Sequence, residues 1–135
     1  MNIEQIAQEV YRVLGPGHSE SLYQKAMAVE LGLQGIPFHT EEHLNVYYKG
    51  HYVDFLRSDI TLLDKSGDRV AILELKAVGS TEFNREQSEQ LLQYMRMTGV
   101  KVGYLINFPK YSSGKKTQHL NPELMFEKFQ LWLKK

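Results

Sequence analysis

The sequence predicts an α/β fold in which a mixed central β-sheet is flanked by α-helices. Two observations support this prediction. Segments with the 3.6-residue period of helices occur near both ends and in the middle of the chain, and strand-like segments separated by turns lie between them. In chain order we expect two helices, three strands, a helix, a strand and a helix, which is an order typical of a layered α/β or α+β sandwich.

Two helices are predicted before the first strand. Residues 3 to 14 carry one apolar helical stripe, and the sequence GPG at 15 to 17 ends it. Ser19 is a suitable N-cap for a second helix over residues 19 to 33, which the sequence QGIPF ends.

Three strand-like segments follow these helices. They are HLNVYYK at 43 to 49, YVDFLRSDITLL at 52 to 63 and RVAILELKAV at 69 to 78, and the turns KGH and DKSGD separate them. The third segment is apolar at nearly every position, so we expect it to be a central strand.

The C-terminal part is predicted to add a helix, a strand and a helix. The first helix spans 82 to 98 with Gly99 as its C-cap, and a buried strand spans 100 to 108. The segment 122 to 135 is predicted to be a final helix, with Trp132 in the core.

Composition indicates a folded protein with no membrane partner. The 135 residues are 42% hydrophobic and 24% charged, and we expect one domain over residues 1 to 135. No apolar run reaches membrane-spanning length, and the N-terminal segment has no apolar signal core. The absence of cysteine excludes disulfides and thiolate metal sites. We therefore expect a cytoplasmic location.

The charge balance bears on nucleic-acid binding. Sixteen basic residues match 16 acidic ones, so the formal net charge is zero. Proteins that hold nucleic acid through its phosphates usually have a basic excess. The balance therefore disfavours a passive nucleic-acid binder, but it is compatible with an enzyme whose acidic metal site offsets a basic groove.

Asp59, Glu74 and Lys76 stand among apolar residues in the predicted hairpin of 58 to 78. Strand alternation places Glu74 and Lys76 on one face, and antiparallel pairing about the turn brings Asp59 close to Glu74. Two adjacent carboxylates suit Mg²⁺ or Mn²⁺, and a neighbouring ammonium is placed to orient an attacking water or to offset phosphate charge.

Two other interpretations of these charges stay open at this point. Acidic residues near a turn are often caps, and E-x-K on a strand is often a solvated face. The acids could also form a structural ion pair with Lys76 and bind no metal. The apolar residues on both sides of ELK argue against a solvated face, because an unpaired charge in a central strand costs several kcal/mol.

The hairpin residues also resemble a known family. Asp59 followed by Glu74-Leu75-Lys76 resembles the D…(D/E)xK signature of the PD-(D/E)XK nuclease superfamily, although Ser58 replaces the usual proline. The resemblance implies a restriction-endonuclease-like core.

A second motif, upstream, narrows this resemblance. Gly17, Glu20 and Tyr23 in GHSESLY match G-x-x-E-x-x-Y, the motif of the GxxExxY family within that superfamily. The runs QLLQYM and VGYLINF resemble that family's helix and closing strand, so the likeness extends over about residues 10 to 108.

The resemblance implies a role for each matched polar residue. Asp59 and Glu74 would be the principal metal ligands, and Glu20 a further acid that reaches the metal. The residues implied to take part in catalysis are Lys76, Glu20 and Gln90.

One helix is implied to border this site. Gln90 and Tyr94 fit the Q-x-x-x-Y element of RecB-like members. A helical projection of 82 to 98 puts Tyr94 on the buried face and Gln90 at its edge, and Gln87, nearer the centre, is a rival for the polar role.

Other residues are assigned more local tasks. Gly17 is expected to permit a tight helix entry, and Tyr23 to be a core aromatic with a bonded hydroxyl. His18 lies beside the site and could approach the metal or a phosphate, but a lone loop histidine is more often neither kind of ligand. Nucleic-acid contacts are expected from basic side chains, from Tyr94 and from the loop KYSSGKK at 110 to 116. The basic side chains are Arg57, Lys49 and Arg85.

The sequence as a whole predicts a Mg²⁺- or Mn²⁺-dependent nuclease that hydrolyses phosphodiester bonds of DNA or RNA. No base-reading motif is visible, so we expect cleavage that is structure-selective or directed by a protein partner. The alternative is a catalytically silent nucleic-acid-binding or accessory module with the same fold. The sequence leaves a homodimer open.

Overall fold

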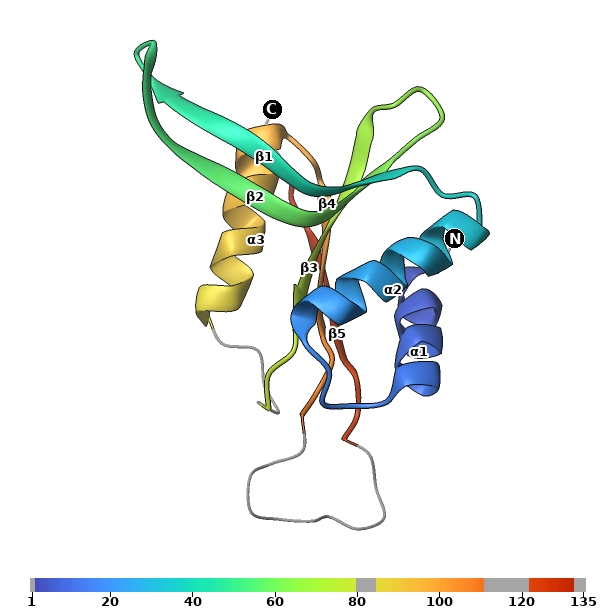
Figure 1. Ribbon diagram of the computed structural model, residues 1–135. Helices are drawn as coiled ribbons and strands as arrows, with labels where there is room; N and C mark the ends of the chain where they lie inside the picture. Colours follow the sequence, from blue (N-terminus) through green and yellow to red (C-terminus); the bar gives the residue numbers. More distant parts are fainter. Residues whose placement is uncertain (1, 80–84, 111–121, 133–135) are drawn as a thin grey trace.

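The computed structural model describes residues 2–79, 85–110 and 122–132. The elements are α1 (Ile3–Leu14), α2 (Glu20–Leu33), β1 (Phe38–Tyr48), β2 (His51–Leu63), β3 (Arg69–Lys76), α3 (Arg85–Thr98), β4 (Val102–Asn107) and β5 (Met125–Gln130). Within these residues, five strands form one sheet in the order β1-β2-β3-β4-β5. The β3–β4 pair is parallel and the other neighbours are antiparallel. The prediction of a mixed sheet flanked by helices is confirmed (Figure 1).

The two N-terminal helices begin and end where the sequence predicts. The Asn2 side chain accepts the N–H of Gln5 at 3.1 Å and caps α1. The Ser19 hydroxyl accepts the N–H of Leu22 at 3.1 Å and caps α2. These side chains satisfy backbone donors that have no partner inside the helix.

The sheet separates two hydrophobic cores. α1 and α2 cover one face, where Ile6, Tyr23 and Met27 pack against Leu73 and Leu75 of β3. The residues of the second core, on the α3 side, are Ile72, Leu91, Tyr94, Met95, Val100 and Leu105. Because β3 contributes side chains to both cores, it is buried on both faces, as its apolar sequence predicts.

β1 and β2 extend well beyond the rest of the sheet. Their pairing runs from Phe38–Leu62 to Tyr48–His51, whereas β2 pairs with β3 only from Ile60 to Leu63. Residues 43–57 therefore form a two-stranded projection, here called the hairpin arm (Figure 1).

The start of β1 differs from the prediction of residue 43. The strand begins at Phe38, because the polar segment HTEE pairs along the edge of β2 although its sequence lacks strand alternation.

The prediction of a C-terminal helix over 122 to 135 is wrong for the residues that the structure describes. Residues 125 to 130 form β5, which pairs antiparallel with the free edge of β4. Phe126 packs on the α1–α2 core and Phe129 on the α3 core. A strand covered on both faces has apolar residues at odd and at even positions, so its sequence lacks the strand alternation and can be read as a helix.

Trp132 is also not a core residue. It is 82% exposed and lies beyond the end of β5, so none of the layers that the structure describes covers it.

Several predicted segments lie partly outside the described residues. These are the first turn of the helix over 82 to 98 and all but Lys110 of the basic loop at 110 to 116. Among the helices that the structure describes, none has the length and apolarity needed to cross a bilayer.

We predict that Gly103→Ala destabilises the protein. A Cβ at this position in β4 would lie 2.5 Å from Met95 Sδ and 2.9 Å from Leu91 Cδ1, both buried in α3. Forcing α3 away from β4 is expected to lower the free energy of unfolding by about 1–3 kcal/mol. Urea denaturation measures this change.

Gly32→Ala is the matched control for this prediction. Nothing lies within 4 Å of a Cβ at Gly32 in α2. An alanine in a helix should stabilise the protein by about 0.5–1 kcal/mol. Equal effects of the two substitutions would contradict the close packing of α3 on β4.

Candidate active site

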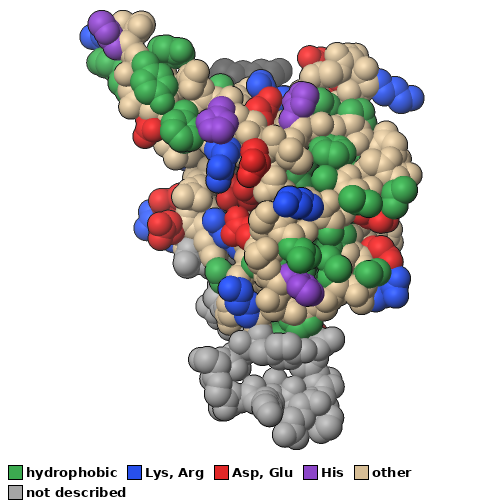
Figure 2. Space-filling view, viewed as in Figure 1, with side chains coloured by type: hydrophobic (Ala, Val, Ile, Leu, Met, Phe, Trp, Pro, Cys, Tyr) green, Lys and Arg blue, Asp and Glu red, His purple; other side chains and the backbone are tan. Residues whose placement is uncertain are grey.

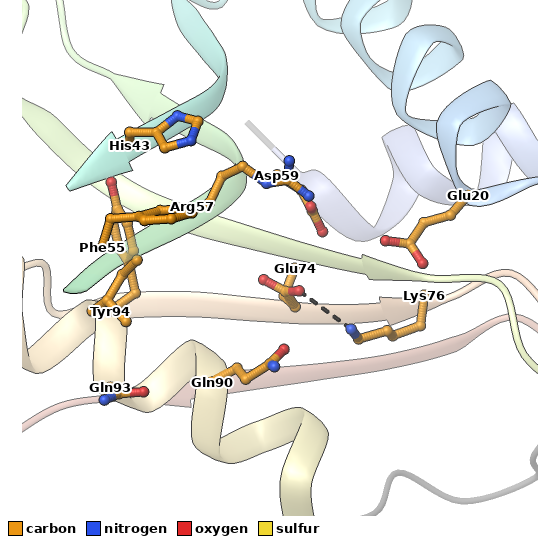
Figure 3. Close-up of a pocket in the computed structure, with 11 residues that line it drawn as sticks. Glu20, His43, Phe55, Arg57, Asp59, Glu74, Lys76, Gln90, Gln93 and Tyr94 are labelled. Atoms are coloured by element: carbon orange, nitrogen blue, oxygen red, sulfur yellow. Dashed lines mark ion pairs between the residues drawn. The ribbon is translucent and has the colours of Figure 1, made fainter. Parts of the chain in front are cut away.

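A pocket of about 490 Å³ lies where β2 and β3 separate (Figure 3). The side chains that converge on it come from β1, β2, β3, the first turn of α2 and the exposed edge of α3. Its lining residues are Glu20, His43, Phe55, Leu56, Arg57, Asp59, Glu74, Lys76, Gln90, Gln93 and Tyr94.

Asp59 marks the point where the two strands separate. The paired register of β2 and β3 begins at Ile60 opposite Leu73, one residue beyond Asp59. The Asp59 carboxylate takes the place of the next backbone partner, because its Oδ2 accepts the N–H of Leu75 at 2.7 Å. This bond fixes a buried carboxylate at the end of the ladder, close to Glu74.

Glu74 and Lys76 project from the same face of β3, as strand alternation predicts. The Lys76 Nζ lies 3.5 Å from Glu74 Oε1, and Figure 3 shows this ion pair facing Glu20 and Gln90. Leu75, between them, is fully buried in the α1–α2 core. The buried leucine fixes the rotation of the strand and thereby the direction of both charged side chains.

Asn107 fixes the end of β3 that carries Lys76. It lies opposite Lys76 in β4, and its side chain exchanges two hydrogen bonds with the backbone of Val78, both at 2.9 Å. The N–H of Phe108 adds a bond to the Lys76 carbonyl at 2.9 Å. These contacts hold the strand end beyond the last regular pair, and nothing in the residue spacing alone indicates them.

The charge of Asp59 opposes the ionisation of the two glutamates in the pocket. Burial, and then the charge of Asp59, raise the pKa of Glu74 to about 8, although Lys76 acts against the shift. Burial also raises the pKa of Asp59, against the Leu75 N–H and the charges of Lys76 and Arg57. Partial burial and then Asp59 raise the pKa of Glu20. A cation at this place would relieve the repulsion.

These residues fit a divalent metal with few protein ligands. Among the described residues, no group of three or more His, Cys, Asp or Glu side chains lies close enough together to form a metal cage. Mg²⁺ commonly binds through one or two carboxylates and keeps waters or substrate phosphate as its other ligands. Asp59 and Glu74 supply such a pair, and Glu20 lies at the rim of the same pocket.

Glu20 is positioned by the loop that precedes α2. The Tyr23 hydroxyl donates to Gly15 O at 2.6 Å and accepts the N–H of His18 at 3.2 Å. The Tyr23 ring is fully buried and stacks on Phe108, with centroids 4.2 Å apart. Tyr23 is therefore a core aromatic with a bonded hydroxyl, as predicted.

Gly17 and His18 complete this loop. Gly17 has φ of 93°, a region that favours glycine, and its N–H donates to Pro109 O at 3.2 Å. This agrees with the predicted tight helix entry. The His18 Nε2 hydrogen-bonds Leu14 O at 2.7 Å, and the ring is not among the pocket-lining side chains.

α3 contributes Gln90, Gln93 and Tyr94 to the pocket. Gln90 is the predicted polar residue of this helix, and its rival Gln87 does not line the pocket. Gln93 was not predicted; it lies three residues after Gln90, so helical spacing could have indicated it.

Tyr94 connects α3 to the edge strand. Its hydroxyl donates to Glu42 Oε1 at 2.9 Å, and Arg69 donates to both oxygens of Glu42 at 2.9 and 3.1 Å. Burial opposes ionisation of Glu42, but the hydrogen bonds from Arg69, Tyr94 and Thr61 hold its pKa below the ordinary value. The negative charge of Glu42 is thus stabilised by hydrogen-bond donors, whereas that of Glu74 is disfavoured.

The structure brings together most of the predicted site residues. Seven of them line the pocket: Glu20, Arg57, Asp59, Glu74, Lys76, Gln90 and Tyr94. Lys49 instead lies in the turn of the hairpin arm, with its Nζ 5.4 Å from the Tyr48 ring centroid. Arg85 begins α3 and pairs with Glu89 at 2.8 Å. His43, Phe55 and Leu56 were not predicted, because they reach the pocket through the pairing of β1 with β2.

Comparison with known proteins identifies the superfamily of this chain. A family model described as the PD-(D/E)XK nuclease superfamily matches residues 1–119. The chain belongs to this superfamily, and its mixed sheet flanked by helices agrees with a restriction-endonuclease-like fold. Members are generally nucleases and typically use divalent metals. No curated protein and no solved structure matches the chain.

We predict that Glu74→Gln stabilises the metal-free protein at alkaline pH. The folded protein keeps a proton on Glu74 up to about pH 8, whereas the unfolded chain loses it near 4.5. Stability is therefore highest below pH 4.5 with respect to this group and falls as the pH rises toward 8. In EDTA above pH 8, Glu74→Gln should raise the free energy of unfolding by roughly 2–5 kcal/mol.

Thermal unfolding from pH 4 to 9 tests this prediction, with Glu127→Gln on exposed β5 as the matched control. The same pH dependence in wild type and Glu74→Gln would show that the Glu74 charge is not buried as described.

A second prediction concerns the loop before Glu20. Tyr23→Phe leaves Gly15 O and the His18 N–H without their partner, so it should lower the free energy of unfolding by about 1–3 kcal/mol. Tyr48→Phe, on the exposed arm, should change it by less than about 0.5 kcal/mol. Differential scanning calorimetry measures both, and equal stabilities would contradict the role of the Tyr23 hydroxyl.

Proposed function

We propose that this protein is a divalent-metal-dependent nuclease of the GxxExxY family, which hydrolyses phosphodiester bonds of DNA or RNA in the pocket between β2 and β3. The observation that supports the proposal is the buried pair Asp59 and Glu74, in which burial and the charge of Asp59 oppose the ionisation of Glu74 beside the ammonium of Lys76. Burying two adjacent carboxyl groups is costly unless a cation or a proton neutralises them. An ion pair that served stability alone would not need the second carboxyl group.

Asp59 and Glu74 are proposed to hold Mg²⁺ or Mn²⁺, with Glu20 as a further ligand at the rim. The ion would neutralise charge on the scissile phosphate and lower the pKa of an attacking water. Asp59 is held by the Leu75 N–H and Glu74 by the rigid central strand, so the pair needs little rearrangement to bind.

Lys76 and Gln90 are proposed to act on the reacting groups. The Lys76 ammonium lies beside the Glu74 carboxyl group, where it can orient the attacking water or bind a phosphate oxygen. Gln90 faces it from α3, and its amide can donate to the same phosphate. Arg57 is proposed to bind the phosphate from the β2 side.

Two features support membership of the GxxExxY family in particular. Gly17 and Tyr23 together shape the loop that presents Glu20 to the pocket, so each residue of the motif serves the same site. Cleavage is proposed to be non-sequence-specific or directed by a protein partner, since the sequence contains no recognisable motif for reading bases.

We predict that Lys76→Ala separates metal binding from cleavage. The variant should bind Mn²⁺ in calorimetric titration, because both carboxylates remain, but should cleave about 10²- to 10⁴-fold more slowly. Glu74→Ala should lose both. Lys128→Ala, at an exposed position of β5, is the control and should match wild type in both measurements.

The cleavage assay uses single-stranded, duplex and branched DNA and RNA with Mg²⁺ or Mn²⁺, and EDTA should abolish all activity. If wild type binds no divalent ion and cuts nothing that Glu74→Ala spares, the nuclease proposal fails. Nucleic-acid binding without cleavage would instead identify a catalytically silent module.

A further inference from the structure

The hairpin arm carries a row of exposed rings that the proposed reaction does not use. They lie with a basic side chain on one face of the arm, and this set is here called the aromatic stripe. Its members, in order from the tip toward the pocket, are Tyr47, Tyr52, Phe55, His43 and Arg57.

The register of β1 and β2 places these residues on one face. His43 pairs with Arg57, and Tyr47 pairs with Tyr52 after a bulge that sets aside Val53. Cross-strand partners point to the same side, and alternate residues along a strand share a face. Phe55 is therefore on the same side as both pairs.

The rings of the stripe form two contacting pairs. The centroids of His43 and Phe55 are 4.9 Å apart, and those of Tyr47 and Tyr52 are 6.0 Å apart. Tyr47, Tyr52 and Phe55 are nevertheless 60%, 55% and 46% exposed. Neighbouring large rings left open to water on a protruding arm indicate a binding surface.

The stripe runs directly into the candidate active site. His43, Phe55 and Arg57 line the pocket, and the charge of Arg57 acts on the carboxyls of Asp59 and Glu20. Figure 2 shows hydrophobic side chains along the arm, then histidine and basic side chains, then the acidic side chains, all on one face. A ligand at the carboxylates that follows this face must lie along the arm.

We propose that the aromatic stripe stacks on unpaired bases of a single-stranded nucleic acid whose backbone reaches the pocket beside Arg57. The substrates would then be single strands, or the single-stranded ends and flaps of duplexes. This inference rests on the proposed nuclease function and specifies its substrate class.

The chemistry of the stripe selects single strands over duplexes. In a duplex the faces of the bases are covered by their neighbours, whereas unpaired bases can stack on aromatic side chains, and such stacking is a main source of affinity in single-strand-binding proteins. Duplex binding depends mainly on phosphate contacts, and this chain has no net positive charge to supply them.

A second copy of the chain is a less suitable occupant. Because the stripe continues into the pocket, a protein seated along it would cover the mouth that holds Asp59 and Glu74. A nucleic-acid strand can occupy the arm and the pocket at the same time, with its bases on the rings and a phosphate at Arg57.

Binding is tested apart from cleavage, in EDTA, with DNA and RNA oligonucleotides that contain one 2-aminopurine, whose fluorescence is quenched by stacking. Wild type should quench the single strand and not the duplex. Tyr47→Ala and Tyr52→Ala should each raise the Kd for the single strand about 5- to 100-fold and reduce the quenching.

Tyr48→Ala is the matched control. Tyr48 lies next to Tyr47 and is equally exposed at 63%, but it pairs with His51 on the opposite face of the arm. Its substitution should change the Kd by no more than about two-fold. Sedimentation of each variant shows whether self-association changes instead.

The outcomes separate this inference from the proposed function. The single-strand-binding role of the stripe would be contradicted by equal effects of Tyr48→Ala and Tyr52→Ala, by duplex binding as tight as single-strand binding, or by a change in self-association alone. If metal-dependent cleavage persists in those cases, the nuclease function holds without a role for the stripe. If single strands bind through the stripe but nothing is cleaved, the binding role holds and the nuclease function fails.

Discussion

The burial of two carboxyl groups side by side is the constraint on which the rest of this structure depends. Asp59 and Glu74 lie together at the point where β2 and β3 separate, and burial raises the pKa of both. The hydrophobic layers on either side hold them there, because β3 contributes Leu73 and Leu75 to one core and Ile72 to the other. The fold thus supplies stability that offsets an unfavourable site, as expected where a protein retains charges for chemistry rather than for folding.

The contrast with Glu42 shows why this site is different from an ordinary buried acid. Glu42 receives two hydrogen bonds from Arg69 and one from Tyr94, and its pKa is lowered. Glu74 has a single cation, Lys76, at 3.5 Å, and a second carboxylate beside it. Two glutamates of one sheet therefore differ in what surrounds them: one has a complete set of donors, and the other has a deficit of positive charge that a metal can fill.

The features predicted from sequence are those that local rules determine. Caps and periodicity locate α1 and α2, and the turn between β2 and β3 determines that Asp59 meets Glu74. The sequence does not predict β5 as a strand, because this segment is a strand only by pairing with the edge of β4, more than 15 residues away in the chain. The same holds for His43 and Phe55, which reach the pocket only through strand pairing, and for the backbone bonds of Asn107.

The hairpin arm resolves a difficulty that the charge balance raises. A nuclease with no net charge has few phosphate contacts with which to hold its substrate, and its own carboxylates repel the backbone that it must approach. Stacking on the proposed aromatic stripe would supply affinity that does not depend on charge, away from the carboxylates, at Tyr47 and Tyr52. Binding on the arm and metal-dependent chemistry in the pocket can then be carried by separate parts of one surface, joined at Arg57. A short, neutral chain can in this way hold a strand firmly enough to act on it without a basic groove.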